Sequence, residues 1–267
     1  MGVLNVTPDS FSDGGTLYRF DRLDPDLLLA RAEQMVADGA AILDIGGEST
    51  RPGAAPVTLD EERDRVLTAV ELITNHLDVV ISVDTSSPEI MAESASIGAG
   101  LLNDVRAFSR AGALEAAGSS GLPVSIMHMS AEPDTMQAKT DYSDVVAEVA
   151  AYLGGRIDAC SQAGIDPSKI VIDPGFGFGK TVVQNYQLLA RLSEFKTFGL
   201  PILVGLSRKS MIGAITGRPA DQRVTPSAVL AVLAAERGAT IIRVHDVAET
   251  KDALDVWAAT LGGGDGS

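Results

Sequence analysis

The chain has 267 residues, 45% hydrophobic and 21% charged, so it can bury a core as large as that of one barrel domain of about 250 residues. Its net charge of −15, from 21 basic and 36 acidic residues, argues against a general surface for nucleic acid or anionic membranes. The apolar stretches are shorter than the roughly 20 residues of a membrane span, and no basic and apolar leader is present. The single cysteine, Cys160, excludes an internal disulfide. We therefore expect a cytoplasmic protein.

Eight short apolar runs alternate with helical patterns along the chain, and polar, charged or glycine residues follow each run. Strands that alternate with helices, with chemistry at the C-terminal ends of the strands, are typical of a (β/α)8 TIM barrel that has its active site on that face. We expect one barrel domain over residues 1–261 and a flexible tail over residues 262–267. The predicted strands are residues 2–6, 41–45, 79–83, 100–103, 123–127, 170–172, 201–204 and 240–244.

The helical segments between these strands carry cap residues that indicate where they begin and end. Helix starts are predicted at Pro25, at a capping box that opens with Thr58, and just before Pro88. Two later segments, residues 141–163 and 223–237, are also predicted to be helical. The glycines predicted to end these two helices are Gly164 and Gly238.

Two connections that follow strands are longer and richer in turn residues than plain linkers. Residues 7–15 and 46–53 overhang the expected pocket, and loops of this length are usually lids or binding loops, although ordinary turn chemistry is the alternative. Basic residues also follow several strands. On an acidic chain we interpret them as a local anion site rather than as a solvated rim. They are Arg51, Arg208, Lys209, Arg243 and His245.

The glycine-rich segment 173–181, Asp-Pro-Gly-Phe-Gly-Phe-Gly-Lys-Thr, is close to a nucleotide-binding loop but misses its spacing. A P-loop has four residues between its first glycine and its Gly-Lys pair, whereas three separate Gly175 from Gly179. The glycines also miss the spacing of the dinucleotide fingerprint. We therefore interpret Asp173 as a ligand-binding residue, the glycines as a sharp turn beneath it, and Phe178 as a ring near the mouth of the pocket.

Carboxylates end three predicted strands, at Asp44, Asp84 and Asp173, and Asn103 ends a fourth. Because an unpaired buried carboxylate costs several kcal/mol, this set predicts internal cations or a ligand rich in N–H donors, such as a pterin or guanine-like ring. A Mg²⁺ site is the alternative, but carboxylates spread around a barrel suit the perimeter of a ring better than one small ion. The histidines without paired spacing, to which we assign structural or rim roles, are His76 and His128.

Long and specific motifs occupy the loops that follow the strands. They are Met-Gly-Val-Leu-Asn-Val-Thr-Pro-Asp-Ser-Phe-Ser-Asp-Gly-Gly at 1–15, Asp-Ile-Gly-Gly-Glu-Ser-Thr-Arg-Pro-Gly at 44–53, Asp-Pro-Gly-Phe-Gly-Phe-Gly-Lys at 173–180, Gly-Leu-Ser-Arg-Lys-Ser at 205–210 and Arg-Val-His-Asp at 243–246. Together they resemble the bacterial dihydropteroate synthase family, from residue 1 to about residue 260. Members usually have a short segment before the first barrel strand, whereas this chain starts at that strand; we expect the difference to bear on stability and on the natural start, not on the chemistry.

The resemblance implies condensation of 6-hydroxymethyl-7,8-dihydropterin pyrophosphate with p-aminobenzoate, giving 7,8-dihydropteroate and pyrophosphate. The residues implied to bind the pterin are Asp44, Asp84, Asn103, Met127, Asp173, Gly205 and Lys209. Those implied to face the pyrophosphate are Asn5, Arg243 and His245, with Asn5 as the protein ligand of a Mg²⁺ cofactor. Those implied to enclose p-aminobenzoate are Phe11, Asp13, Thr50, Arg51, Pro52, Phe178, Lys209 and Ser210. The catalytic roles fall to Asp84, Asp173, Lys209, Arg243 and His245.

The implied reaction needs no covalent nucleophile, and no residue set in the chain resembles one with its base. Loss of pyrophosphate leaves a carbocation conjugated to the pterin, which favours an SN1-like order with the pterin substrate bound first, while direct displacement stays open. The alternatives are a pterin-binding methyltransferase domain, an inactive pterin-binding module and a sulfonamide-insensitive synthase. The first of these would not need Arg243 and His245 for a pyrophosphate.

The resemblance also sets expectations for partners and inhibitors. We expect small-molecule substrates, no nucleic-acid or membrane partner, and a homodimer formed through helices late in the chain, as is common among relatives. The turn at 173–181 lacks the extra residues associated with resistant relatives, and Thr50-Arg51-Pro52 is uninterrupted, so the sequence predicts sensitivity to sulfonamides.

Overall fold

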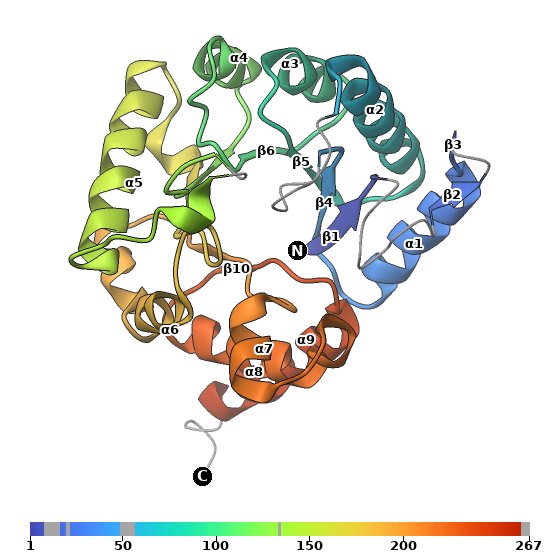
Figure 1. Ribbon diagram of the computed structural model, residues 1–267. Helices are drawn as coiled ribbons and strands as arrows, with labels where there is room; N and C mark the ends of the chain where they lie inside the picture. Colours follow the sequence, from blue (N-terminus) through green and yellow to red (C-terminus); the bar gives the residue numbers. More distant parts are fainter. Residues whose placement is uncertain (8–16, 20–21, 49–56, 133–134, 263–267) are drawn as a thin grey trace.

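Parallel strands form a ring that is surrounded by helices (Figure 1). The computed structural model describes residues 1–7, 17–19, 22–48, 57–132 and 135–262. The strands of the ring are β1 (Gly2–Asn5), β4 (Ile42–Gly46), β5 (Val80–Asp84), β6 (Leu101–Asp104), β7 (Val124–Met127), β8 (Ile170–Asp173), β9 (Leu203–Val204) and β10 (Ile241–Ile242). The first six pair in this order as one parallel sheet, and β9 pairs with β10. Single parallel bridges, Ile172 to Ile202 and Gly2 to Val244, join the two sheets at both edges and complete the (β/α)8 barrel.

The observed strands differ from the predicted ones mainly at their ends. Several begin one residue later than predicted, and β9 and β10 keep only two residues each. The shortening has a local cause, because the N–H groups of Thr240 and Ile241 both donate to the carbonyl of Ile202, at 2.9 and 3.1 Å, which interrupts the regular ladder. One antiparallel hairpin was not predicted, since strands of two residues show no alternating pattern. It consists of β2 (Tyr18–Arg19) and β3 (Arg22–Leu23).

The predicted helix starts are confirmed by the cap geometry. Pro25 and Pro88 are the first residues of α1 and α3, and Thr58 opens the capping box of α2. The segment predicted at 141–163 begins later, because the side chain of Asp144 caps α5 by accepting two backbone N–H groups. The helices are α1 (Pro25–Ala37), α2 (Leu59–His76), α3 (Pro88–Ser96), α4 (Ala113–Ser120), α5 (Val145–Gln162), α6 (Val182–Ala190), α7 (Ser210–Thr216), α8 (Val224–Glu236) and α9 (Val247–Gly262).

The helix ends follow the predicted glycines with one exception. Gly164 and Gly238 follow α5 and α8 in the left-handed region, with φ of +85° and +104°. Gly262, which the sequence places in the tail, is the last residue of α9, and residues 263–267 lie outside the described part. Among the described helices, none has the length and apolar character that a membrane span requires. The 3-10 helices are η1 (Met136–Ala138), η2 (Pro167–Lys169), η3 (Leu192–Phe198) and η4 (Ala220–Gln222).

Side chains on the two faces of the strands have opposite character. On β4, Leu43 and Ile45 are fully buried among apolar side chains from the surrounding helices. Between them Asp44 points to the opposite face and is also fully buried. The same alternation holds on β5, where Ser82 lies between apolar neighbours. The outer face of the ring therefore supplies the hydrophobic core, and the interior holds polar groups at the carboxyl ends of the strands.

Candidate active site

The strand register gathers the predicted site residues at one end of the barrel. Asn5 pairs with Gly46, Gly46 with Asp84, and Asp84 with Asn103, so these four positions form one row across four strands. Residues paired in register point to the same side of a parallel sheet. Met127 and Asp173 pair in the same way on β7 and β8. The convergence of strand ends that the sequence predicts is confirmed.

Arg243 forms the electrostatic centre of this site by bonding to two carboxylates. Its Nε donates to Asp44 Oδ2 at 2.5 Å and its Nη2 to Asp84 Oδ2 at 3.1 Å. Asp44 also accepts from Ser82 Oγ at 2.5 Å, and Asn103 Nδ2 lies 3.4 Å from both of its oxygens. Buried carboxylates require a counter-ion, and Arg243 is that internal cation. The sequence assigned Arg243 to the pyrophosphate and to catalysis, and its ion pairs with Asp44 and Asp84 are contacts that this assignment did not include.

The proton affinity of Asp84 reflects its crowded surroundings. Burial raises the pKa of Asp84 to about 8, the Asp44 carboxylate acts in the same direction, and Arg243 opposes both. A carboxyl with a raised pKa in the folded state stabilises the fold fully below its unfolded value of 3.8, and that contribution is lost as the pH rises towards about 8.

The raised pKa of Asp84 predicts how the stability of the substrate-free protein changes with pH. We expect the free energy of unfolding of the parent, relative to Asp84→Asn, to fall between about pH 4 and about pH 8 by an amount of the order of 1–3 kcal/mol. Urea unfolding of both proteins across this range measures the difference. A constant or rising difference would contradict a raised pKa at Asp84.

Asp173 and Lys209 are a second pair of opposite charges in the site. Asp173 Oδ1 accepts the backbone N–H of Gly175 at 2.7 Å, and Lys209 Nζ donates to the carbonyl of Phe176 and lies 4.9 Å from the centre of the Phe178 ring. Burial raises the pKa of Asp173, which Lys209 opposes, and burial lowers the pKa of Lys209 to about 8, which Asp173 opposes. Burial therefore disfavours the charged form of both groups, and the charge of each partner offsets only part of that effect.

The loops after β9 and β10 contact each other at the rim. The backbone N–H of His245 donates to Ser207 Oγ at 3.2 Å, and its Nδ1 lies 3.0 Å from the same oxygen. Arg208 forms a bidentate ion pair with Asp246, so its charge is matched by a carboxylate, and this differs from the predicted role in an anion site. Ser210 is exposed at the first turn of α7.

Gly205 was predicted to line the pterin site. A side chain at Gly205 would approach Lys209 Nζ to 3.8 Å and Arg243 to 4.0 Å, so the glycine leaves room between the two cations. Most of the predicted p-aminobenzoate residues fall outside the described part of the chain. They are Phe11, Asp13, Thr50, Arg51 and Pro52.

The predicted metal ligand Asn5 lies beside Asp84. A Cβ atom at Gly46 would lie 3.8 Å from both Asn5 Oδ1 and Asp84 Oδ2, so the two oxygen atoms face the same side of this glycine. No cluster of three or more His, Cys, Asp or Glu side chains suited to a metal occurs within the described ranges. An amide oxygen and a carboxylate suit Mg²⁺ only if phosphate oxygens and water supply the remaining ligands.

Two buried residues of the site region were missed by sequence reasoning. Asp104 is fully buried and accepts from Ser86 Oγ and from the N–H groups of Arg106 and Phe108, so it braces the loop after β6. Its position next to Asn103 at the end of a strand could have identified Asp104 as a residue of the site region. Lys180, considered only as part of a failed P-loop, is buried under the glycine-rich turn.

Comparison with known proteins agrees with this geometry. The family model for pterin binding enzymes matches residues 1–245. The dihydropteroate synthase of Escherichia coli K12 is 54% identical over 98% of this chain and 91% of its own length. The chain belongs to the dihydropteroate synthase family.

Solved structures of this family superpose on nearly the whole chain. The dihydropteroate synthase of Yersinia pestis in complex with a sulfonamide drug has a TM-score of 0.94 and 50% identity, covering 98% of this chain and 93% of that one. The synthase of Xanthomonas albilineans in complex with 7,8-dihydropteroate has a TM-score of 0.86 and 44% identity, covering 97% of this chain and 92% of that one. The predicted fold and the family resemblance are both confirmed, and the family's enzymes are transferases.

Proposed function

We propose that this chain condenses 6-hydroxymethyl-7,8-dihydropterin pyrophosphate with p-aminobenzoate to form 7,8-dihydropteroate and pyrophosphate. The observation that carries the proposal is the interior polar set around Arg243 and Lys209. Asp84 and Asp173 accept hydrogen bonds, and Asn103 both donates and accepts, which matches the edge of a pterin ring. The complex of the Xanthomonas albilineans relative with 7,8-dihydropteroate supports the same ligand class.

The proposed reaction exchanges a C–O bond for a C–N bond. The bond between the pterin methylene carbon and the pyrophosphate oxygen breaks, and its electron pair leaves with pyrophosphate. The neutral amine of p-aminobenzoate then forms the C–N bond and releases a proton. Asp84 and Asp173 stabilise the positive charge that develops on the pterin, while Arg243 and His245 face the departing anion. This division of roles favours an SN1-like order.

The same proposal includes a Mg²⁺ ion at the pyrophosphate end. Asn5 would supply an amide oxygen and Asp84 a neighbouring carboxylate, with pyrophosphate oxygens and water completing the shell. When bound, the ion would neutralise charge on the leaving group. Asn5 would hold the ion, and Arg243 would share the anion with it.

Product formation with each substrate omitted in turn tests the proposed function. We expect the purified chain to release pyrophosphate and form dihydropteroate only when the pterin pyrophosphate, p-aminobenzoate and Mg²⁺ are all present. Pyrophosphate release without p-aminobenzoate would indicate a hydrolase. Binding of the pterin without turnover would indicate a binding module.

Sulfonamides should compete with p-aminobenzoate. Their aniline and sulfonyl groups match the amine and carboxylate of the substrate, and the relative from Yersinia pestis binds such a drug. We expect competitive inhibition at low micromolar concentration, an affinity of roughly −7 to −8 kcal/mol. A dose series at several p-aminobenzoate concentrations measures it, and full turnover in millimolar drug would place the chain among the resistant synthases.

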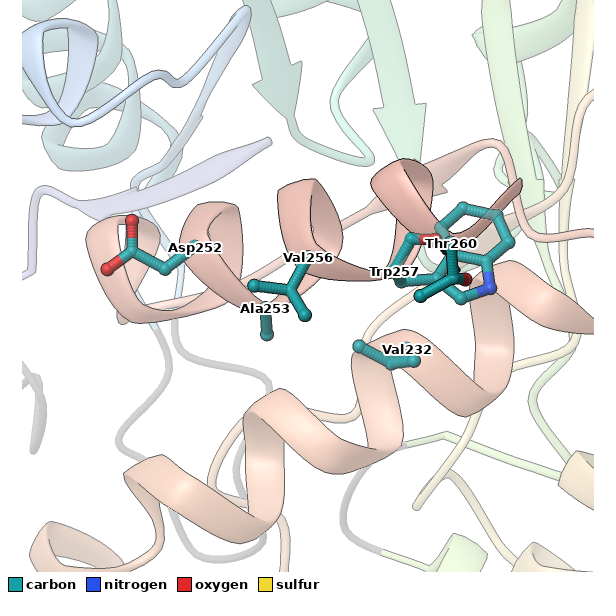
Figure 2. A pocket seen from close by; sticks show the side chains of 6 residues that line it. All are labelled: Val232, Asp252, Ala253, Val256, Trp257 and Thr260. Atoms are coloured by element: carbon teal, nitrogen blue, oxygen red, sulfur yellow. Dashed lines mark hydrogen bonds between the residues drawn. The ribbon is translucent and has the colours of Figure 1, made fainter. Parts of the chain in front are cut away.

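We also propose a homodimer through α8 and α9. Figure 2 shows an apolar hollow between these helices, in which Val256 and Trp257 of α9 lie close to Val232 of α8. Val256 exposes 69% of its surface, and Val229 of α8 and Leu261 of α9 expose 54% and 65%, so both helices present large apolar side chains that a partner could cover. We also propose a cytoplasmic location, which is supported by the single cysteine, Cys160, because it is buried and free.

A charge placed on this face should separate the subunits. We expect Val256→Glu to elute as a monomer in size-exclusion chromatography with light scattering, because burying a carboxylate in an apolar interface costs several kcal/mol. Val183→Glu, at a residue of α6 that is 66% exposed, is the control and should leave the parent mass unchanged. A dimeric Val256→Glu protein would place the interface elsewhere.

A further inference from the structure

Lys180 is a buried lysine whose ammonium group has a full set of acceptors. Only 4% of the residue is exposed. Its Nζ donates to the carbonyl of Gly175 at 2.7 Å and to that of Phe178 at 3.1 Å, and it lies 3.0 Å from His128 Nδ1. Three acceptors match the three donors of an ammonium group. Burial and the nearby Lys180 charge lower the pKa of His128 to about 3, which keeps Nδ1 available as an acceptor.

The two carbonyls that Lys180 binds belong to opposite ends of the glycine-rich turn. Gly175 donates its N–H to Asp173, so the first end carries the carboxylate assigned to the pterin. Phe178 lies under the ammonium of Lys209, so the second end carries the ring assigned to p-aminobenzoate. One buried cation thus touches the backbone next to both subsites.

The turn uses backbone conformations that glycine adopts readily and other residues rarely adopt. Gly175, Gly177 and Gly179 all adopt left-handed φ values, of +71°, +82° and +64°. A side chain at Gly175 would meet the carbonyl of His128 at 1.9 Å, so the glycine is required there. Because glycine adds conformational freedom, the turn needs an external brace to keep one conformation.

Other side chains each brace one residue of the turn: Asp173 bonds to Gly175, Lys209 bonds to Phe176, and two more side chains bond to Gly177. Asn185 Oδ1 accepts the N–H of Gly177 at 2.7 Å, and Gln137 Nε2 donates to the carbonyl of the same residue at 3.0 Å. Neither contact reaches Gly175 or Phe178. The backbone joins the two ends once, because the N–H of Phe178 donates to the carbonyl of Gly175 at 3.2 Å, and Lys180 adds the side-chain link by binding the carbonyls of both residues.

We propose that Lys180 is a positioning residue that couples the two substrate subsites by tying the pterin-side and p-aminobenzoate-side ends of the 174–179 turn to one ammonium group. The inference rests on the proposed function for its substrates. It gives the lysine of the Gly-Lys-Thr segment, which misses the spacing of a P-loop, a supporting role under the site. Burial lowers the pKa of Lys180 to about 7; the Asp173 charge opposes this shift, and the Lys209 charge adds to it.

Steady-state kinetics with Lys180→Met tests the coupling. Methionine keeps the length and apolar stem of lysine but removes the charge and all three donors. We expect the KM values for the pterin pyrophosphate and for p-aminobenzoate both to rise by about tenfold, as for loss of 1.4 kcal/mol of binding each, while kcat changes less than about threefold. Lys169→Met is the matched control, because Lys169 Nζ also binds a carbonyl, that of Gly121, but at an exposed site on the opposite end of β8.

The pattern of constants separates positioning from a purely structural role. A merely destabilised protein would lose active fraction, which lowers kcat and leaves both KM values at the parent level; that result would overturn the proposal. A rise confined to one substrate would overturn the coupling. Lys180→Gln, which restores two N–H donors, should recover part of both KM values together. If the parent itself makes no dihydropteroate, the proposed function fails first, and the two failures are distinguishable.

Discussion

Replacement of Arg243 by alanine is expected to lower kcat/KM for the pterin pyrophosphate at least about 100-fold, because a positive charge is removed from an anion whose charge grows in the transition state. The same change leaves the buried Asp44 and the neighbouring Asp84 without their counter-ion. Breaking a buried ion pair costs about 3–5 kcal/mol of stability. We expect a loss near the lower end of this range, because the guanidinium is 24% exposed and Asp84 can take up a proton.

The structure adds an effect on the pterin itself. Arg243 contacts two carboxylates of the pterin slot, so calorimetric affinity for a pterin that lacks the pyrophosphate should also fall in the alanine variant. Arg63→Ala is the control, because Arg63 forms an exposed pair with Glu93, and this variant should keep the stability and pterin affinity of the parent. Unchanged pterin affinity in Arg243→Ala would restrict its role to the anion.

Asp173→Asn should weaken pterin binding by about 2–3 kcal/mol, roughly 30- to 150-fold. Asparagine can still accept the N–H of Gly175, so the turn keeps its main local contact. It cannot offer two anionic oxygens to ring N–H donors, and it removes the negative charge that supports Lys209. Isothermal calorimetry with a pterin analogue measures the change.

Asp166→Asn provides the matched control for this experiment. Asp166 caps the short helix η2 that precedes β8, at the end of the strand remote from Asp173, and accepts the N–H of Ser168 at 2.9 Å. Its substitution should leave pterin affinity at the parent value. Equal losses in the two variants, or none in Asp173→Asn, would remove Asp173 from the pterin site.

Much of the architecture was predictable from local patterns. Apolar runs that end in polar residues predicted the strands, and cap residues such as Thr58 and Pro88 predicted where helices begin. These signals act over a few residues of chain, so they survive without knowledge of the fold. Because parallel strands align their carboxyl ends, the same patterns also predicted that Asp84, Asn103 and Asp173 would converge.

Partner choice within the site was decided only by the tertiary structure. Arg243 is 199 residues from Asp44 and 159 residues from Asp84, and closure of the barrel brings all three together. Arg208, which looks equivalent in sequence, meets Asp246 instead. A basic residue after a strand predicts a charge on the site face, but which carboxylate it reaches depends on strand register and side-chain direction.

The tertiary structure also gives Lys180 and Lys209 different surroundings. Both lysines follow strands at the carboxyl face, and both would pass as anion ligands in a list of basic residues. The left-handed glycines fold the turn back over Lys180, where carbonyl groups satisfy its ammonium, whereas Lys209 lies beside the Phe178 ring and the Asp173 charge. The sequence by itself determined the barrel, the family and the set of charged residues on one face. The tertiary structure alone decided which charges pair internally, because those pairs form between residues far apart in the chain.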